Sequence, residues 1–189
     1  IYTAHCLETY GYEEINLNVG CPSGTVVSKG RGAGFLGRPE ELDRFLDEVF
    51  EGVKTPISIK TRIGVEDPEE FYPLLQIFNR YPVYELTIHP RVRRDFYRGC
   101  PNLDAFEMAL KESCNPVCYN GDIRSTEDYE RICRRFPDLD RIMIGRGVIA
   151  DPGLTEEIYG AEKTSRKKIF GFEQRVREEY KKWMPPDPV

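Results

Sequence analysis

The residue of this sequence best placed to do chemistry is Cys21, which lies between Gly20 and Pro22 where an alternating stretch, residues 15–18, ends. We expect the glycine to allow a backbone conformation closed to other residues and the proline to fix the next turn, which places the thiol at a strand end. The glycine-rich residues 29–35 would let a flat ligand or a second backbone approach. The alternative is a structural cysteine, since free cysteines usually pack as small hydrophobic groups.

Further stretches that read as strands also end in residues able to bind or react. Together with the stretch that precedes Cys21, the expected strands end at Asn18, Lys60, His89, Asn120 and Gly145. Each interval between two of these ends contains one stretch with helical periodicity. Single helices between successive strands are typical of a parallel βα array. The five ends would then lie on one rim, at the carboxyl ends of the strands, where βα barrels and doubly wound sheets build their sites.

Hydrophobic periodicity predicts the elements that would position this rim. Strands are expected at residues 15–18, 56–62, 84–89, 116–120 and 141–144. Helices are expected at residues 3–12, 39–52, 68–78, 103–113 and 125–136, with a separate charged helix at 165–183. Ser125 and Asp128 have the spacing of a capping box, and Pro185 with Pro186 should stop the last helix.

Two glycine-bearing loops, residues 120–122 and 145–147, follow the last two expected strands. In βα barrels this pair of loops is the common phosphate site, and a helix start there would attract an anion. Lys60, His89 and Arg91 would add cationic or donor groups at neighbouring strand ends.

Each of these groups also has a structural alternative. Lys60 could form an ion pair with Glu85 or Asp122, and His89 could be a core histidine bonded to backbone. Their common place on one rim favours a site, because perturbed ionisable groups gather at functional sites.

The composition is that of an ordinary globular protein, with 189 residues, 40% hydrophobic and 31% charged. No apolar run has membrane length, and no basic and apolar leader follows Ile1. The six cysteines lie on unrelated elements, so we expect them to be reduced, in a cytoplasmic protein. No close Cys or His pair completes a zinc set, so no metal site is expected.

The net charge of −5 argues against a wholly basic nucleic-acid surface. Two local clusters of cations are the exception, and solvated faces are the alternative interpretation of both. The clusters comprise Arg91, Arg93, Arg94 and Arg98, and then Arg166, Lys167, Lys168, Arg175, Arg177, Lys181 and Lys182.

Seven short segments in succession resemble the signatures of the tRNA-dihydrouridine synthase family. They are residues 18–22, the loop up to Gly34, and residues 58–62, 88–91, 97–99, 119–123 and 143–147. The resemblance covers about residues 11–151, and these segments follow the family's order and spacing. Val92 departs from the family's usual threonine.

The resemblance implies an FMN-dependent (β/α)8 TIM barrel that reduces the C5–C6 double bond of a flipped-out uridine in tRNA. The flavin would give hydride to C6, Cys21 would protonate C5, and NADPH would reduce the flavin. The implied FMN-binding residues are Lys60, His89, Asn120, Gly121, Asp122, Gly145 and Arg146. The implied substrate-binding residues are Asn18, Arg91, Arg93, Arg94 and Tyr97.

The same resemblance predicts the organisation of the chain. Residues 1–160 would be part of the catalytic barrel, with about five βα units, and residues 161–189 would begin a helical tRNA-binding region. The family's first three strands would precede residue 1, so we expect residues 1–189 alone neither to close a barrel nor to bind FMN firmly. Self-association through strand edges at residues 15–18 and 141–144 is expected instead.

Two other functions remain open. One is another FMN-barrel oxidoreductase, of the dihydroorotate dehydrogenase or ene-reductase type. The other is a non-catalytic RNA-binding remnant. Arg93, Arg94, Arg98 and the basic C-terminal helix favour RNA over a small substrate.

Overall fold

The computed structural model describes residues 1–184, in which helices alternate with the strands of a parallel sheet. The strands are β1 (Ile15–Asn18), β2 (Ile57–Arg62), β3 (Leu86–His89) and β4 (Val117–Tyr119). They lie in the order β1-β2-β3-β4, and every adjacent pair is parallel. This sheet confirms the expected parallel βα array and agrees with part of a TIM barrel.

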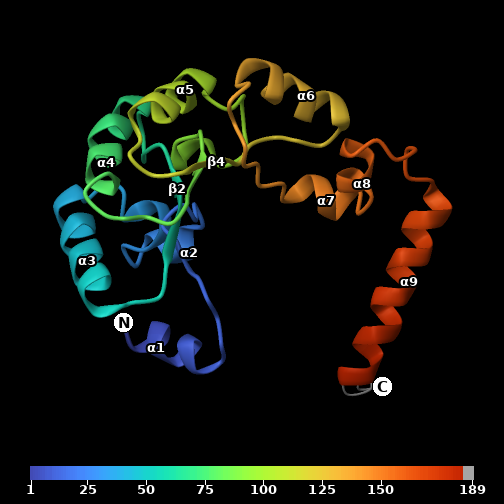
Figure 1. Cartoon of the computed structure of the whole chain (residues 1–189), viewed down its shortest axis with the longest axis horizontal. Helices are drawn as coiled ribbons and strands as arrows, with labels where there is room; N and C mark the ends of the chain where they lie inside the picture. The colour runs from blue at the N-terminus through green and yellow to red at the C-terminus, as the bar shows by residue number, and fades with distance from the viewer. Residues whose placement is uncertain (185–189) are drawn as a thin grey trace. The chain divides into compact units, whose positions relative to one another are not determined.

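Helices occupy the intervals between the strands and the C-terminal part of the chain (Figure 1). The α-helices are α1 (Tyr2–Thr9), α2 (Gly24–Val27), α3 (Pro39–Gly52), α4 (Phe71–Phe78), α5 (Leu103–Glu112), α6 (Thr126–Arg135), α7 (Arg146–Ala150), α8 (Leu154–Ile158) and α9 (Arg166–Trp183). Short 3₁₀ turns are η1 (Gly32–Gly34), η2 (Pro68–Glu70) and η3 (Arg93–Asp95).

The described chain forms two compact units. The first unit comprises Ile1–Gly121 with Asp138–Met143, and the second comprises Asp122–Pro137 with the described residues from Ile144 onward. The sheet belongs to the first unit, and α6 to α9 belong to the second.

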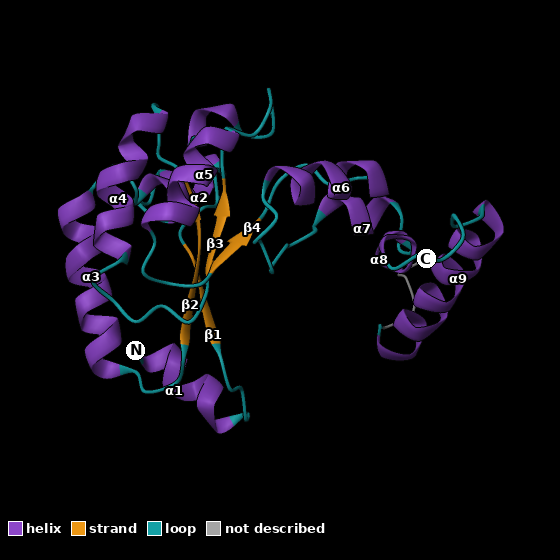
Figure 2. Cartoon of the chain, turned by 45° about the horizontal axis from the view of Figure 1, so that its top comes forward, coloured by secondary structure: helices purple, strands orange, loops and turns teal. Residues whose placement is uncertain are grey.

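In the first unit, α3 and α4 lie alongside the sheet (Figure 2). Helix α3 starts with Pro39 at its first turn and buries Leu42, Leu46 and Val49, which recur at helical spacing. Ile59 of β2 is fully buried on the strand. The hydrophobic core of the first unit therefore contains both the sheet and these helices.

A row of polar side chains crosses the sheet. The register aligns Asn18 with Lys60, Lys60 with Thr87, and Thr87 with Cys118. Residues aligned in neighbouring strands point to the same face, so these four side chains share one face of the sheet. At one end of this row, Asn18 is the last residue of β1, so it lies at the carboxyl edge where the candidate site residues were expected.

The expected fifth strand at residues 141–144 is reduced to a single bridge between Tyr119 and Ile142. The bridge consists of hydrogen bonds from Tyr119 N to Arg141 O and from Met143 N to Tyr119 O. Beyond this bridge, the Asn120 side-chain amide donates to Met143 O at 2.9 Å, which is the next contact between the two segments.

In the second unit, α6 and α9 begin near the predicted residues. The Ser125 side chain accepts from Asp128 N, but the Asp128 carboxylate accepts from Arg124 N, so only half of the capping box forms. Helix α9 is exposed along its whole length, including Trp183. Pro185 and Pro186 lie outside the described residues.

Within residues 1–184, no helix is long and apolar enough to cross a membrane. The same residues contain no group of three or more His, Cys, Asp or Glu side chains arranged to hold a metal ion.

The cysteines of the first unit should differ in reactivity. Burial, followed by the nearby Glu85 carboxylate, raises the pKa of the Cys118 thiol to about 12, whereas Cys100 and Cys114 are exposed. Only the thiolate reacts with iodoacetamide, so at pH 8 we expect modification of Cys100 and Cys114 but not of Cys118 in the native protein. Peptide mass spectrometry would measure this, and native Cys118 reacting as fast as Cys114 would contradict the assignment.

Candidate active site

Cys21 lies in the loop between β1 and α2, which we call the cysteine loop (residues 19–23). Its backbone is fixed at successive positions: Val19 N donates to Lys60 O at 2.9 Å, and Gly20 N donates to Asn18 Oδ1 at 3.1 Å. The Cys21 carbonyl in turn accepts from Ala33 N at 2.9 Å. Cys21 itself is half-buried. The thiol is therefore carried by an ordered backbone and remains accessible.

Two glycines allow this packing, and only one does so through its backbone conformation. Gly20 has no left-handed φ, contrary to the sequence-based expectation. Instead, a Cβ at Gly20 would lie 3.0 Å from Thr61 C and 3.2 Å from Arg62 N, so the cysteine loop lies directly on the end of β2. Gly32 has φ +54°, and a Cβ there would lie 2.7 Å from Cys21 O. The glycine-rich segment thus admits a second backbone, as expected.

Lys60 is half-buried on β2, two residues before the strand ends, and its side chain makes no hydrogen bond or ion pair within the described residues. The alternative ion pair with Glu85 is absent, because Glu85 accepts from Thr87 and lies 3.4 Å from Arg141 Nη1. Burial lowers the pKa of Lys60, and the Arg62 guanidinium lowers it further. The Lys60 ammonium therefore has no hydrogen-bond acceptor among the described residues.

His89 and Arg91 form a buried pair. Arg91 is 1% exposed; it donates to Arg98 O at 3.0 Å and Gly99 O at 2.5 Å, and its Nη1 lies 3.0 Å from His89 Nε2. A guanidinium can only donate, so His89 Nε2 accepts in this contact. The contact does not test the alternative interpretation of His89 as a core histidine bonded to backbone. Contact of Arg91 with flavin or uridine stays a prediction.

The loop that follows β3, residues 92–98, is here called the rim loop. Its Tyr97 is exposed, and the Tyr97 ring lies 6.1 Å from the His89 ring, centroid to centroid. Arg94 is exposed, whereas Arg93 is half-buried, with Nη1 3.4 Å from Glu66 Oε1. The rim loop thus presents an aromatic ring and a cation to solvent.

Arg62 is a site residue whose role the sequence did not reveal. It is 2% exposed and donates from Nε to Gly20 O, the carbonyl that precedes Cys21, at 3.0 Å. The one available signal was its place two residues after Lys60 on the same strand, since such residues share a face of the sheet. The acceptors come from distant loops, which no local pattern identifies.

The predicted FMN-binding residues fall in both units. Lys60, His89, Asn120 and Gly121 belong to the first unit, and Asp122, Gly145 and Arg146 belong to the second. In the first, the Tyr119 hydroxyl would lie 2.0 Å from a Cβ at Gly121, so Gly121 has room for no side chain.

In the second unit, the two glycine-bearing loops lie against each other. Arg146 Nη2 donates to Asp122 Oδ1 at 2.6 Å, and a Cβ at Gly147 would lie 2.2 Å from Ile123 O. Gly145 has open space around it. The pairing of loops that the sequence predicted is therefore present within this unit.

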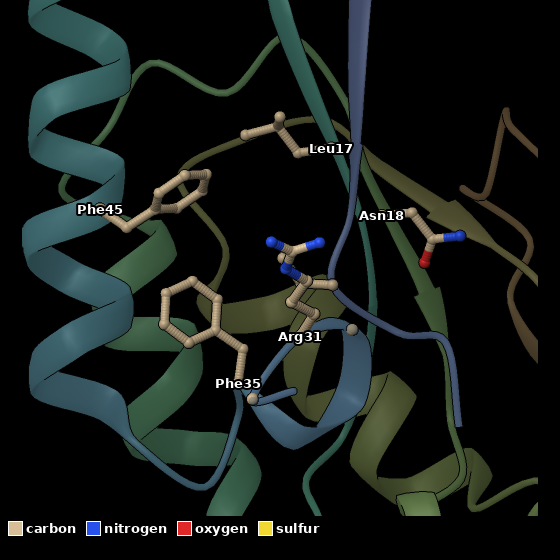
Figure 3. Close-up of a pocket in the computed structure, with 8 residues that line it drawn as sticks. Leu17, Asn18, Arg31, Phe35 and Phe45 are labelled. Carbon is tan, nitrogen blue, oxygen red and sulfur yellow. The ribbon is translucent and has the colours of Figure 1, made fainter. Parts of the chain in front are cut away.

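A cavity of about 370 Å³ lies beside β1. Leu17, Phe35 and Phe45 point into it together with the Arg31 guanidinium, while the Asn18 side chain points to the other side of β1 (Figure 3). The Phe35 and Phe45 rings meet edge to face at 5.4 Å. Asn18 and Val19 also line this largely apolar cavity, which therefore reaches the end of β1, whereas Lys60 is not among its lining residues.

Comparison with known proteins identifies relatives with one common name. The chain is 34% identical over 163 residues to a probable tRNA-dihydrouridine synthase of Rickettsia prowazekii, a match that covers 85% of this chain and 49% of that protein. It is 32% identical over 146 residues to tRNA-dihydrouridine synthase B of Pasteurella multocida, covering 77% and 44%. It is 30% identical over 190 residues to tRNA-dihydrouridine(20/20a) synthase of Vibrio cholerae, covering 92% and 55%.

The chain spans about half the length of the curated relatives it matches. The model of the family described as dihydrouridine synthase (Dus) matches residues 1–183, which is nearly the whole chain. The parallel sheet and its intervening helices agree with part of a TIM-barrel domain of this family. The chain therefore belongs to the dihydrouridine synthase family.

Proposed function

We propose that this chain forms part of an enzyme that reduces uridine in tRNA to 5,6-dihydrouridine, with FMN as cofactor and NADPH as electron donor. The observation that carries the proposal is the half-buried Cys21, on a backbone fixed by hydrogen bonds, beside Lys60, a half-buried ammonium with no acceptor among the described residues. A proton donor and an unpaired cation at one strand edge suit a reaction that protonates carbon beside an electron-rich cofactor.

The residues present fit a flavin mononucleotide. Lys60 needs an acceptor, and the ring and ribityl oxygens of FMN would provide one. We assign Asn120, Gly121 and His89 of the first unit to this cofactor. The assignment of Asp122, Gly145 and Arg146 of the second unit to FMN rests on the family resemblance. The Arg146 guanidinium suits a phosphate, because charge-assisted hydrogen bonds to phosphate are strong. When bound, FMN would supply the hydride to C6 after reduction by NADPH.

In this reaction the protein itself would supply the proton. Cys21 Sγ–H would give its proton to C5 of the uracil ring as C6 receives hydride, which adds two hydrogen atoms across the double bond. The Lys60 ammonium would stabilise the thiolate that remains. Because Cys21 is half-exposed, water can return a proton to it between turnovers.

Single-stranded RNA is the substrate that the rim loop fits. Exposed aromatic rings stack on bases of any sequence, and arginines bind phosphates. We assign Tyr97 to base stacking, Arg93 and Arg94 to phosphates, and Asn18 and Arg91 to the uridine. A small-molecule substrate, as in other FMN-barrel oxidoreductases, would not need these exposed groups.

The first test is Cys21→Ala in the full protein with FMN bound. We expect dihydrouridine formation to fall about 10²–10⁴-fold, because only the proton donor is removed, while NADPH still reduces the flavin. Flavin absorbance and mass spectrometry of the tRNA would measure the two steps. Cys114→Ala, at an exposed cysteine, is the matched control and should match the wild type. A wild-type rate in Cys21→Ala would disprove the assignment.

The second test concerns the ionisation of Lys60. Burial lowers its folded-state pKa, so the unfolded chain binds more protons between the folded and unfolded pKa values, and the wild type gains stability as pH rises through that window. Lys60→Met removes the charged group whose burial destabilises the wild type below this pH window. We expect the flavin-free variant to unfold about 1–3 °C above the wild type at pH 7, a gap that closes towards pH 10.

The same Lys60→Met variant should bind FMN more weakly, since it lacks the donor. Thermal unfolding at both pH values and fluorescence titration with FMN would measure the two effects. Lys54→Met removes an exposed lysine and serves as the control. Unchanged FMN affinity, or a stability gap that stays constant with pH, would contradict the role given to Lys60.

The third test is Arg146→Ala. Loss of a hydrogen bond to a charged phosphate should raise the dissociation constant for FMN about 10- to 100-fold and leave turnover at saturating FMN nearly unchanged. Titration with FMN and turnover assays separate these effects. Arg134→Ala, an exposed arginine of the second unit, should keep the wild-type affinity. The phosphate assignment fails if both variants bind FMN equally well.

A further inference from the structure

Arg62 is a buried cation whose hydrogen bonds all go to backbone carbonyls, although the Asp95 carboxylate is near enough to interact with it electrostatically. Its three donor groups reach three backbone carbonyls: Nε to Gly20 O at 3.0 Å, Nη1 to Val92 O at 3.0 Å and Nη2 to Phe96 O at 2.6 Å. Within the described residues it forms no ion pair with a carboxylate. Burying a charge is costly even when it is fully hydrogen-bonded, so an arginine here needs a reason beyond filling space.

The three carbonyls belong to the cysteine loop and the rim loop. Gly20 directly precedes Cys21, whereas Val92 and Phe96 lie on either side of η3 in the rim loop. A single planar guanidinium therefore links the backbone beside the proposed acid to the segment proposed to contact RNA. The rigid fork of arginine suits this task, because its donors have a fixed mutual geometry that a lysine ammonium lacks.

The rim loop has an unfavourable backbone conformation at Phe96, and contacts with Arg62 hold it there. Phe96 has φ +51°, a region that non-glycine residues rarely adopt, and such conformations persist only where surrounding contacts impose them. Arg62 supplies one such contact at the Phe96 carbonyl. The Tyr97 ring lies over the same guanidinium, with 5.5 Å from Cζ to the ring centroid.

The cysteine loop meets the same part of β2 independently of the guanidinium. Gly20 packs so closely on the Thr61 and Arg62 backbone that a Cβ would be 3.0 Å from Thr61 C. The position of Cys21 along this surface is then set by two successive carbonyls, Gly20 O held by Arg62 and Cys21 O held by Ala33 N.

We propose that Arg62 is a positioning residue that fixes the Cys21 thiol and makes its placement depend on the rim loop. The proposal rests on the assigned role of Cys21 as the acid. It extends that role by naming the residue that aligns the donor with C5 of the base. Replacing the Arg62 guanidinium should let the cysteine loop move, and it should leave in place every group that touches substrate or flavin.

Arg62→Lys in the FMN-loaded full protein is the main test, because it keeps the charge and loses the fork. We expect iodoacetamide to modify Cys21 severalfold faster, as its loop loosens, while Cys114 in the same sample reacts at its wild-type rate. Single-turnover reduction of uridine in tRNA should fall about 10- to 100-fold, because the donor is misplaced. FMN affinity and flavin reduction by NADPH should not change. Arg80→Lys, at an exposed arginine paired with Asp43, is the matched control.

A second variant covers the case in which Arg62→Lys does not fold. Gly20→Ala keeps the guanidinium but pushes the cysteine loop off β2, and it should produce the same change confined to Cys21. Equal acceleration of Cys21 and Cys114 would show general loosening and overturn the proposal, as would unchanged reactivity and single-turnover rates. Failure of the acid assignment is distinguishable, because then Cys21→Ala stays active while the alkylation of Cys21 still responds to Arg62→Lys.

Discussion

The parallel pairing of β1 with β2 fixes where the residues of the candidate site lie. Asn18 lies opposite Lys60, and the ladder continues for one further hydrogen bond, from Val19 N to Lys60 O. The cysteine loop consequently starts beside the lysine and lies on the end of β2. A slip of one residue would turn every side chain of β1 to the other face, and the apolar Leu17 would then lie where Asn18 lies. The register thus couples the hydrophobic core to the polar face.

Most of the elements could be predicted from the sequence, because their signals are local. The predicted bounds of β1 and α3 agree with the structure residue for residue, since the helix starts at a proline and buries a regular apolar stripe. The relation between polar residues and strand ends was also predictable, because it follows from the parallel topology alone. Local periodicity is therefore enough to place the cysteine, the lysine and the histidine at one edge of a sheet.

The failures of prediction arise where a distant group decides the outcome. Residues 141–144 have the composition of a strand, but they pair with β4 through a single bridge, and their next contact is the Asn120 side-chain amide on Met143 O. Gly20 was expected for its conformational freedom and is required instead because the end of β2 leaves no room for a Cβ. The role of Arg62 could not be predicted from the sequence, since two of its acceptors lie 30 and 34 residues further along the chain. Tertiary packing, and not local propensity, determines each of these three features.

Three cations lie at or near this edge, and their surroundings distinguish structural from ligand-binding roles. Arg62 and Arg91 are almost completely buried, and both donate to backbone carbonyls through guanidinium groups of fixed shape. Lys60 is less buried and has no acceptor within the described residues, although burial already lowers its pKa. A sheet that needed only stability would gain by an apolar residue at this position, because an unpaired buried charge is destabilising. Both arginines therefore hold loop backbone, whereas Lys60 is the cation whose side chain has no acceptor within the described residues, which is the basis of its proposed role in binding FMN.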